Sequence, residues 1–302
     1  MKARTLWWAA LLVLLPAPAL AWGPATHLFA GYYAAFNLNL LAPAAAALLS
    51  EWFAAFLYGT ISADIYVGKG SRGGPRHCHN WGIGATILAR AENDEQRAFA
   101  WGYLSHLAAD VTAHNFYVPT QLFSAPLPGK AAHVFWETHC ELALDQRLWR
   151  VARHLVRYHP PACNRLLRCV WEKGRLNHAA GNRLFGTSIL IGNLTAWQRF
   201  ATGLARHLPW QPDPKYLPLL QNVTLGVALE YLRDPDGSRA VRYDPVGSTP
   251  LLAARRQRRA GTRDNPFRIA PDLYDLRISR PQRAAFDVWL DGRLTRALRG
   301  HI

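Results

Sequence analysis

The segment from Ala100 to Asn115 constrains this chain more than any other stretch of the sequence. It is rich in Ala and Leu and has no Pro, a composition typical of an α-helix. His106, Asp110 and His114 are spaced four residues apart, so with about 3.6 residues per turn they share one helix face. A buried face that carries two imidazoles and a carboxylate favours a divalent cation. The alternative is a polar face open to solvent, or an Asp110 hydrogen-bonded to the two histidines.

The first 21 residues have the three parts of a secretory signal peptide. Lys2 and Arg4 precede an apolar run over residues 6–15, and the small residues at 19–21 form a cleavage site. The run is short for a membrane span, although an uncleaved anchor is the alternative. We therefore expect a secreted or periplasmic protein whose mature chain begins at Trp22.

Composition adds a charge constraint. The chain has 35 Lys and Arg residues against 20 Asp and Glu, a formal net charge of +15. Such a balance favours anionic lipid head groups, nucleic acid or phosphate-bearing substrates as partners, unless it reflects a generally Arg-rich proteome. Half of the residues are hydrophobic, which excludes a disordered chain.

The periodicity predicts an all-α fold, because no repeat and no sustained alternating strand pattern occurs. Helices are expected over residues 43–58, 83–93, 96–116, 131–157, 193–207, 216–233 and 281–299, with shorter ones within residues 160–190. We expect a metal-binding helical core over residues 22–158 and a C-terminal helical extension over residues 159–302. The basic run 255–259 is expected to be a solvated, mobile stretch.

Four cysteines are present: Cys78, Cys140, Cys163 and Cys169. An oxidising compartment permits disulfides, and four thiols allow three pairings. A local bridge between Cys163 and Cys169 is plausible. Cys78 and Cys140 each lie beside a histidine, so metal ligation is an alternative for them. We favour structural roles for all four.

Histidines are concentrated in one half of the chain, with seven of the twelve between His27 and His139. His133 and Glu137 form an i, i+4 pair that can chelate one ion from one helix turn. His139 and Glu141 offer an off-register alternative.

Two further stretches add candidate ligands. Asp64 is expected in a connector where its carboxylate can point inward. His77 and His79 alternate, so at most one easily faces the same cavity. Nitrogen and oxygen donors with several carboxylates suit Zn²⁺, with Mn²⁺ or Fe²⁺ as alternatives.

Taken in order, these residues resemble the zinc-dependent phospholipase C family and its relatives, the S1/P1 nucleases. The residues that carry the resemblance are Trp22, His27, Asp64, His77-Cys78-His79-Asn80, His106, Asp110, His114, His133 and Glu137. The interval from Asp110 to His114 is shorter than in well-known secreted members. The resemblance implies an all-α fold that holds up to three zinc ions in a cleft.

The resemblance also implies a role for each ligand. The free amine and carbonyl of Trp22, with His27, would bind one zinc. Asp64, His77 (or alternatively His79) and His106 would bind a second, and Asp110 would bridge these two ions. His114, His133 and Glu137 would hold the third. A site of this kind is complete only after cleavage before Trp22.

The implied activity is hydrolysis of a phosphodiester by a metal-activated water, with Asp64 as a possible proton acceptor. Cleavage of phospholipids to diacylglycerol and a phosphorylated head group is the favoured reaction. An S1/P1-type single-strand nuclease is one alternative, favoured by the basic surface and the Trp22–His27 spacing, whereas Glu137 favours the phospholipase. The other is a non-catalytic periplasmic or membrane-surface binding protein that keeps metals for stability.

Overall fold

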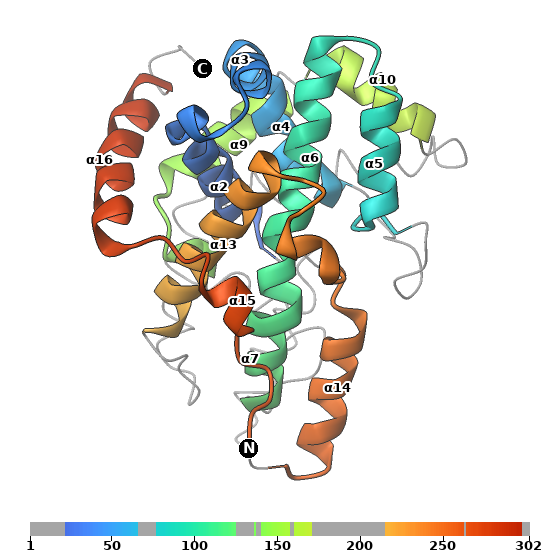
Figure 1. The fold of residues 1–302 in the computed structure, drawn as a ribbon, viewed down its shortest axis with the longest axis vertical. Coiled ribbons are helices and arrows are strands. Elements are labelled where there is room, and N and C mark those ends of the chain that lie inside the picture. Colours follow the sequence, from blue (N-terminus) through green and yellow to red (C-terminus); the bar gives the residue numbers. More distant parts are fainter. Residues whose placement is uncertain are drawn as a thin grey trace.

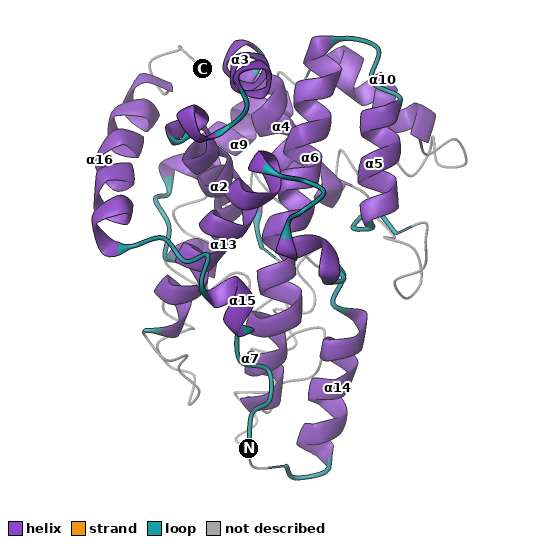
Figure 2. Ribbon diagram, viewed as in Figure 1, coloured by secondary structure: helices purple, strands orange, loops and turns teal. Residues whose placement is uncertain are grey.

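The computed structural model describes residues 22–65, 77–124, 136, 140–157, 160–170, 215–262 and 264–297. Every regular element in these ranges is a helix, which confirms the all-α prediction (Figure 2). The α-helices are α2 (Pro24–Phe36), α3 (Pro43–Glu51), α4 (Phe53–Ser62), α5 (Trp81–Ala89), α6 (Asp94–Thr112), α7 (Val118–Ser124), α9 (Arg147–Arg157), α10 (Pro161–Val170), α13 (Tyr216–Arg233), α14 (Ser248–Arg259), α15 (Pro271–Tyr274) and α16 (Arg280–Ala297). The short turns are η1 (Leu38–Leu40), η2 (Ala63–Ile65), the π-helical η3 (Ala113–Tyr117) and η4 (Arg239–Arg242).

Helix α6 runs through the middle of the molecule (Figure 1). Asn93 caps its first turn by accepting a hydrogen bond from the Gln96 amide at 2.9 Å, and Asp94 and Glu95 add negative charge where the helix dipole favours it. Helices α2, α4, α5 and α13 pack around α6, so its face is buried almost throughout. The residues on this helix are therefore shielded from water.

Helices α4 and α6 touch through their backbones. A Cβ atom at Gly59 would lie 2.1 Å from the Phe99 carbonyl oxygen, and one at Gly102 would lie 2.0 Å from the Phe56 carbonyl oxygen. Only glycine allows this approach. The crossing brings the end of α4, and with it Asp64, against the middle of α6.

The C-terminal part of the chain packs onto the same core. Helix α13 lies against both α2 and α6. The buried ring of Phe286 on α16 contacts Phe29, Tyr33 and Phe36 of α2, with ring centroids 5.0–5.7 Å apart. The helices that carry the site are thus braced by residues far along the chain.

Several predicted helix boundaries need correction. The helix expected over residues 43–58 is broken at Trp52 into α3 and α4, which are bent by 88°. The helix expected over 131–157 is interrupted at Asp145, and a new helix begins at Arg147. The Arg147 amide donates a hydrogen bond to Asp145 Oδ1 at 2.8 Å. Asp64 lies in η2 directly after α4, because α4 extends to Ser62.

The predictions for the C-terminal half had different outcomes. The helix over 216–233 is confirmed as α13, and the last helix is α16. The run 255–259 is not an irregular stretch but the C-terminal end of α14. The helix predicted over 193–207 lies outside the described residues, as do residues 171–190.

The predicted local disulfide is wrong. None of the four cysteines, all of them within the described residues, is paired in a disulfide. Cys163 and Cys169 both belong to α10, and six residues of helix rise separate their Cα atoms by about 9 Å, beyond the reach of a disulfide. Cys163 is buried and Cys169 is exposed.

Within the described ranges, no single helix has the length and apolarity needed to span a membrane. Only α3 and α4 taken together pass that test, as a pair bent by 88°.

Candidate metal centre

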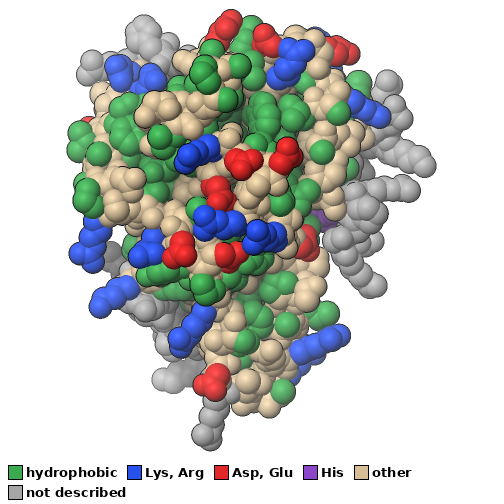
Figure 3. Space-filling view, in the orientation of Figure 1, with side chains coloured by type: hydrophobic (Ala, Val, Ile, Leu, Met, Phe, Trp, Pro, Cys, Tyr) green, Lys and Arg blue, Asp and Glu red, His purple; other side chains and the backbone are tan. Residues whose placement is uncertain are grey.

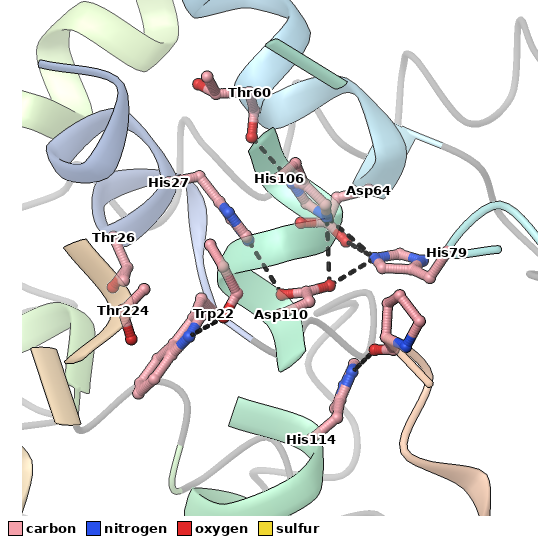
Figure 4. Close-up of polar contacts among 12 residues, drawn as sticks. Trp22, Thr26, His27, Thr60, Asp64, His79, His106, Asp110, His114 and Thr224 are labelled. Carbon is pink, nitrogen blue, oxygen red and sulfur yellow. Dashed lines mark hydrogen bonds and ion pairs between the residues drawn. The ribbon is translucent and has the colours of Figure 1, made fainter. Parts of the chain in front are cut away.

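Five buried side chains from four parts of the chain meet beside α6. His27 comes from the first turn of α2, Asp64 from η2, and His79 from the turn before α5, while His106 and Asp110 come from α6 itself. Each is at most 1% exposed. Figure 4 shows them pointing toward one another.

Asp110 lies at the centre of this cluster. Its Oδ1 is 3.4 Å from His27 Nε2, and its Oδ2 is 3.1 Å from His79 Nε2 and 3.3 Å from His106 Nε2. The Oδ1 of Asp64 is 3.2 Å from His79 Nε2. The donor atoms form two groups that could each hold an ion, His27 with His106 and Asp110, and Asp64 with His79 and His106.

A backbone carbonyl sets the tautomer of His106. Its Nδ1 lies 2.8 Å from the Thr60 carbonyl oxygen, which can only accept a hydrogen bond. In the neutral ring Nε2 therefore carries a lone pair, and it faces His79 Nε2 at 3.1 Å and Asp110 Oδ2 at 3.3 Å. A proton or a metal ion shared between these atoms would relieve their repulsion, and a carbonyl on the other ring nitrogen is typical of metal-bound histidine.

Unpaired polar atoms lead to the same conclusion. His27 Nε2 and both carboxylate oxygens of Asp110 are buried, and their contacts with one another and with His79 and His106, at 3.1–3.4 Å, do not have the geometry of full hydrogen bonds. Leaving such atoms unpaired in a dry interior is costly. Imidazole nitrogen and carboxylate oxygen are ligands that zinc prefers, so these residues fit a zinc ion.

The pKa shifts of His27 and Asp110 favour the protonation states in which these side chains can bind a metal ion. Burial, and then the neighbouring His106, lower the pKa of His27, which keeps this imidazole neutral at pH 7. Burial on its own would raise the pKa of Asp110, but His106, His27 and His79 hold it well below its ordinary value. Asp110 is thus a carboxylate, and a cation beside it stabilises that charge.

The structure places His79, and not the preferred His77, beside Asp64 and Asp110. His77 is partly exposed, and its Nδ1 accepts a hydrogen bond from the His79 amide at 3.1 Å. Tyr103 of α6 donates to the Cys78 carbonyl at 2.6 Å, which fixes this turn against α6. The Cys78 thiol lies 3.1 Å from His79 Nδ1, so it contacts the far nitrogen of the ring that faces the cluster.

His114 does not continue the α6 face as the i, i+4 spacing predicted. It lies in η3, whose π-helical turn changes the register after Thr112. Its Nδ1 is hydrogen-bonded to the Pro245 carbonyl, which places the proton of a neutral ring on Nδ1, and its ring centroid is 6.2 Å from that of His79. Gly247 has a φ of +61°, and a Cβ there would meet the His114 carbonyl at 2.4 Å.

Trp22 is fully buried beside Asp110 (Figure 4). Its indole nitrogen donates to the Ala109 carbonyl at 3.0 Å and lies 3.3 Å from the Thr112 hydroxyl, which in turn is 2.6 Å from the Thr224 hydroxyl of α13. The first residue of the predicted mature chain is therefore anchored to α6.

The remaining predicted ligands are not all placed. His133, Glu137 and His139 lie outside the described residues. Glu141, an off-register alternative, contacts the start of α2 and belongs to neither group around Asp110.

The family model described as zinc dependent phospholipase C matches residues 26–174. These residues belong to the zinc-dependent phospholipase C family. The family segment contains every predicted ligand except Trp22, and its name agrees with the zinc-like donor set around Asp110. No curated protein and no solved structure matched the chain.

Three contributors to the site escaped the sequence analysis: the Thr60 carbonyl, the Pro245 carbonyl and the Thr112–Thr224 pair. Two of them are main-chain oxygens, which any residue type would supply. Residue identity therefore carries no signal for them.

Proposed function

We propose that this protein is a zinc-dependent phosphodiester hydrolase that cleaves phospholipids in the manner of a phospholipase C. The observation that supports this most strongly is the position of Asp110, whose Oδ1 faces His27 while its Oδ2 faces His79 and His106. A carboxylate placed in this way can bridge two ions, which is the arrangement that in-line displacement at phosphorus requires.

In this proposal, each residue of the cluster has a separate task. His27, with the amine and carbonyl of Trp22, would hold one zinc. Asp64, His79 and His106 would hold a second, and Asp110 would be a ligand to both. His114, His133 and Glu137 would hold a third. Zinc, when bound, lowers the pKa of a coordinated water and neutralises the phosphate oxygens.

The chain's own groups handle the proton. Asp64 accepts a proton from the attacking water, whose oxygen bonds to phosphorus, and the bond from phosphorus to the diacylglycerol oxygen breaks. The leaving oxygen takes up the proton that Asp64 accepted, which gives diacylglycerol and a phosphorylated head group. The Thr60 carbonyl holds the His106 ring in position throughout.

The deciding experiment compares two substrates on one preparation. The mature protein, loaded with zinc, should hydrolyse phosphatidylcholine and leave single-stranded DNA intact, and Asp110→Asn should abolish the hydrolysis. Asp291→Asn, a change at an exposed carboxylate that pairs with Arg147, is the matched control and should keep full activity. Cleavage of DNA alone would instead establish the nuclease, and zinc binding without either activity would establish a non-catalytic protein.

We also infer that the protein acts after secretion, with Trp22 at its N-terminus. The buried position of Trp22 against α6 supports this, because an uncleaved leader attached to the Trp22 nitrogen would have to pass out of the same buried site. N-terminal sequencing of the secreted protein should begin at Trp22. Any other start would remove the α-amine from the ligand set.

Helix α14 is our candidate for contact with an anionic membrane surface. Leu252, Arg255, Arg256 and Arg259 are exposed at spacings that place them on one side of the helix, and Leu252 is 47% exposed. The three arginines form no ion pair with any described residue, and no acidic residue lies within α14. Blue and green side chains lie over this region in Figure 3.

Vesicle sedimentation tests this contact. Each arginine near an anionic surface strengthens binding by about 1 kcal/mol, so changing Arg255, Arg256 and Arg259 to Gln should weaken binding to phosphatidylserine-containing vesicles roughly 100-fold. The same three-charge change at the exposed Arg153, Arg165 and Arg168 is the control. Equal weakening by the control set would show that only net charge matters.

A further inference from the structure

Glu141 is a buried carboxylate that the proposed chemistry does not use. Its Oε2 accepts a hydrogen bond from the Ala25 amide at 2.8 Å, and its Oε1 accepts one from the Thr26 amide at 3.0 Å and another from the Thr26 hydroxyl. The side chain is 3% exposed. Both oxygens are thus occupied at the start of α2.

Helix α2 lacks a cap of its own. Its N-cap residue is Gly23, which has no side chain, and α2 has no acidic residue in its first turn. The first amides of a helix need an acceptor, and the helix dipole favours a negative group there. Glu141 supplies both from more than a hundred residues away in sequence.

The carboxylate also packs directly on the backbone before α2. A Cβ atom at Gly23 would lie 2.5 Å from the Cγ and Cδ atoms of Glu141. Only glycine leaves room for the side chain here. The contact therefore lies between Trp22 on one side and His27, one turn into the helix, on the other.

These contacts connect Glu141 to one particular metal. Trp22 and His27 are the two residues proposed to hold the first zinc with Asp110. Both belong to the short segment that Glu141 contacts. We propose that Glu141 is the positioning residue for this zinc: it fixes the N-terminal segment so that the Trp22 amine and the His27 imidazole reach the ion together. The inference rests on the proposed metal centre.

The test measures how many zinc ions the mature protein binds and the affinity of each. Zinc is titrated against a chelator of known affinity in unmodified protein, Glu141→Gln and Gly23→Ala. Glutamine keeps the shape of Glu141 but cannot accept at both positions, whereas a Cβ at Gly23 displaces an intact carboxylate. Loss of an outer partner of a metal ligand weakens binding about 10- to 100-fold. We expect a weakening of that size for one zinc equivalent in both variants, with the others unchanged.

Glu230→Gln is the matched control. Glu230 also accepts a backbone amide, that of Arg239 at 3.0 Å, and a hydroxyl, that of Ser238 at 3.2 Å, but it caps η4 outside the cluster. This variant should bind zinc as the unmodified protein does. If Glu141→Gln does not fold, as judged by helical circular dichroism, then Gly23→Ala and the milder Thr26→Val decide.

The outcomes separate the two proposals. Unchanged zinc affinity in the Glu141 and Gly23 variants overturns the inference and leaves the proposed function standing. So does an equal weakening of every zinc, because that result would mean a general loss of stability. An unmodified mature protein that binds no zinc overturns both.

Discussion

A few main-chain oxygens decide the chemistry of individual residues in this site. His106 and His114 each bond through Nδ1 to a carbonyl, of Thr60 and Pro245 respectively. That bond places the proton of a neutral ring on Nδ1 and leaves the lone pair on Nε2. A histidine with this support is a preformed ligand, because neither its tautomer nor its orientation changes when an ion binds.

The choice between His77 and His79 leads to the first prediction. His79→Ala should remove at least one zinc equivalent and abolish hydrolysis, because His79 Nε2 faces both Asp64 and Asp110. His77→Ala should keep the full zinc content, since His77 belongs to neither donor group that contains His106 and its Nδ1 accepts the His79 amide. Zinc analysis of both variants checks this, and a reversed result would return the ligand role to His77.

Glu141 gives a pH prediction for the metal-free protein. Burial raises the pKa of Glu141 from 4.5 to about 7. Between these values the native state holds a proton that the unfolded chain has released, so the contribution of Glu141 to stability falls as pH rises through this window and is constant above it. The loss is about 3 kcal/mol.

Urea unfolding of chelator-treated protein between pH 4.5 and 8 measures this loss of stability. The lowered pKa of His27 acts in the opposite direction, because that ring stays neutral in the native state while it is charged in the unfolded chain. The informative quantity is therefore the difference in unfolding free energy between the unmodified protein and Glu141→Gln. A difference that does not vary with pH would contradict the prediction.

At the scale of elements, the crossing of α4 and α6 sets the distance between Asp64 and His106. Gly59→Ala should destabilise the fold by about 2–3 kcal/mol, because its Cβ would meet the backbone at Phe99 and force the helices apart. Zinc affinity should fall with it. Thermal unfolding and zinc titration give the two readouts.

Gly292→Ala provides the control for this prediction. Gly292 lies within α16, and a Cβ there has nothing within 4 Å. The change should stabilise the protein by about 0.5–1 kcal/mol, because alanine favours helix over glycine. Equal destabilisation by both changes would mean that the crossing has no special role.

The π-helical turn η3 explains why one sequence expectation failed. An i, i+4, i+8 series predicts one face only if the helix keeps its register, and η3 breaks the register between Asp110 and His114. Composition gives no warning of such a turn. Its position next to the cluster agrees with the tendency of π-helical turns to occur at functional sites.

At the scale of the whole molecule, local signals predicted well and distant contacts did not. The all-α class and the bounds of α13 followed from hydrophobic periodicity. His27, Asp64, His106 and Asp110 followed from residue type and spacing, together with the family resemblance. The break at Trp52, the choice of His79 and the placement of Glu141 depend on packing between remote segments, which spacing does not encode.

The brace formed by α16 gives the last prediction. Phe286→Ala should destabilise the protein by about 3–5 kcal/mol, because this buried ring packs against three aromatic residues of α2. The zinc content of the folded protein should not change, since Phe286 has no contact with the cluster. Val288→Ala, at a residue 77% exposed, should alter stability by less than about 0.5 kcal/mol and serves as the control.

The contact between His114 and the Pro245 carbonyl bears on how this protein can be divided. The family segment ends at residue 174, yet a carbonyl about seventy residues beyond it orients one of its histidines. Thr224 on α13 likewise completes the hydrogen bonds that begin at Trp22. A fragment ending at residue 174 would keep the predicted ligands but lose the Pro245 carbonyl and the Thr224 hydroxyl. Any transplant of this centre into another scaffold must carry the chain through Gly247.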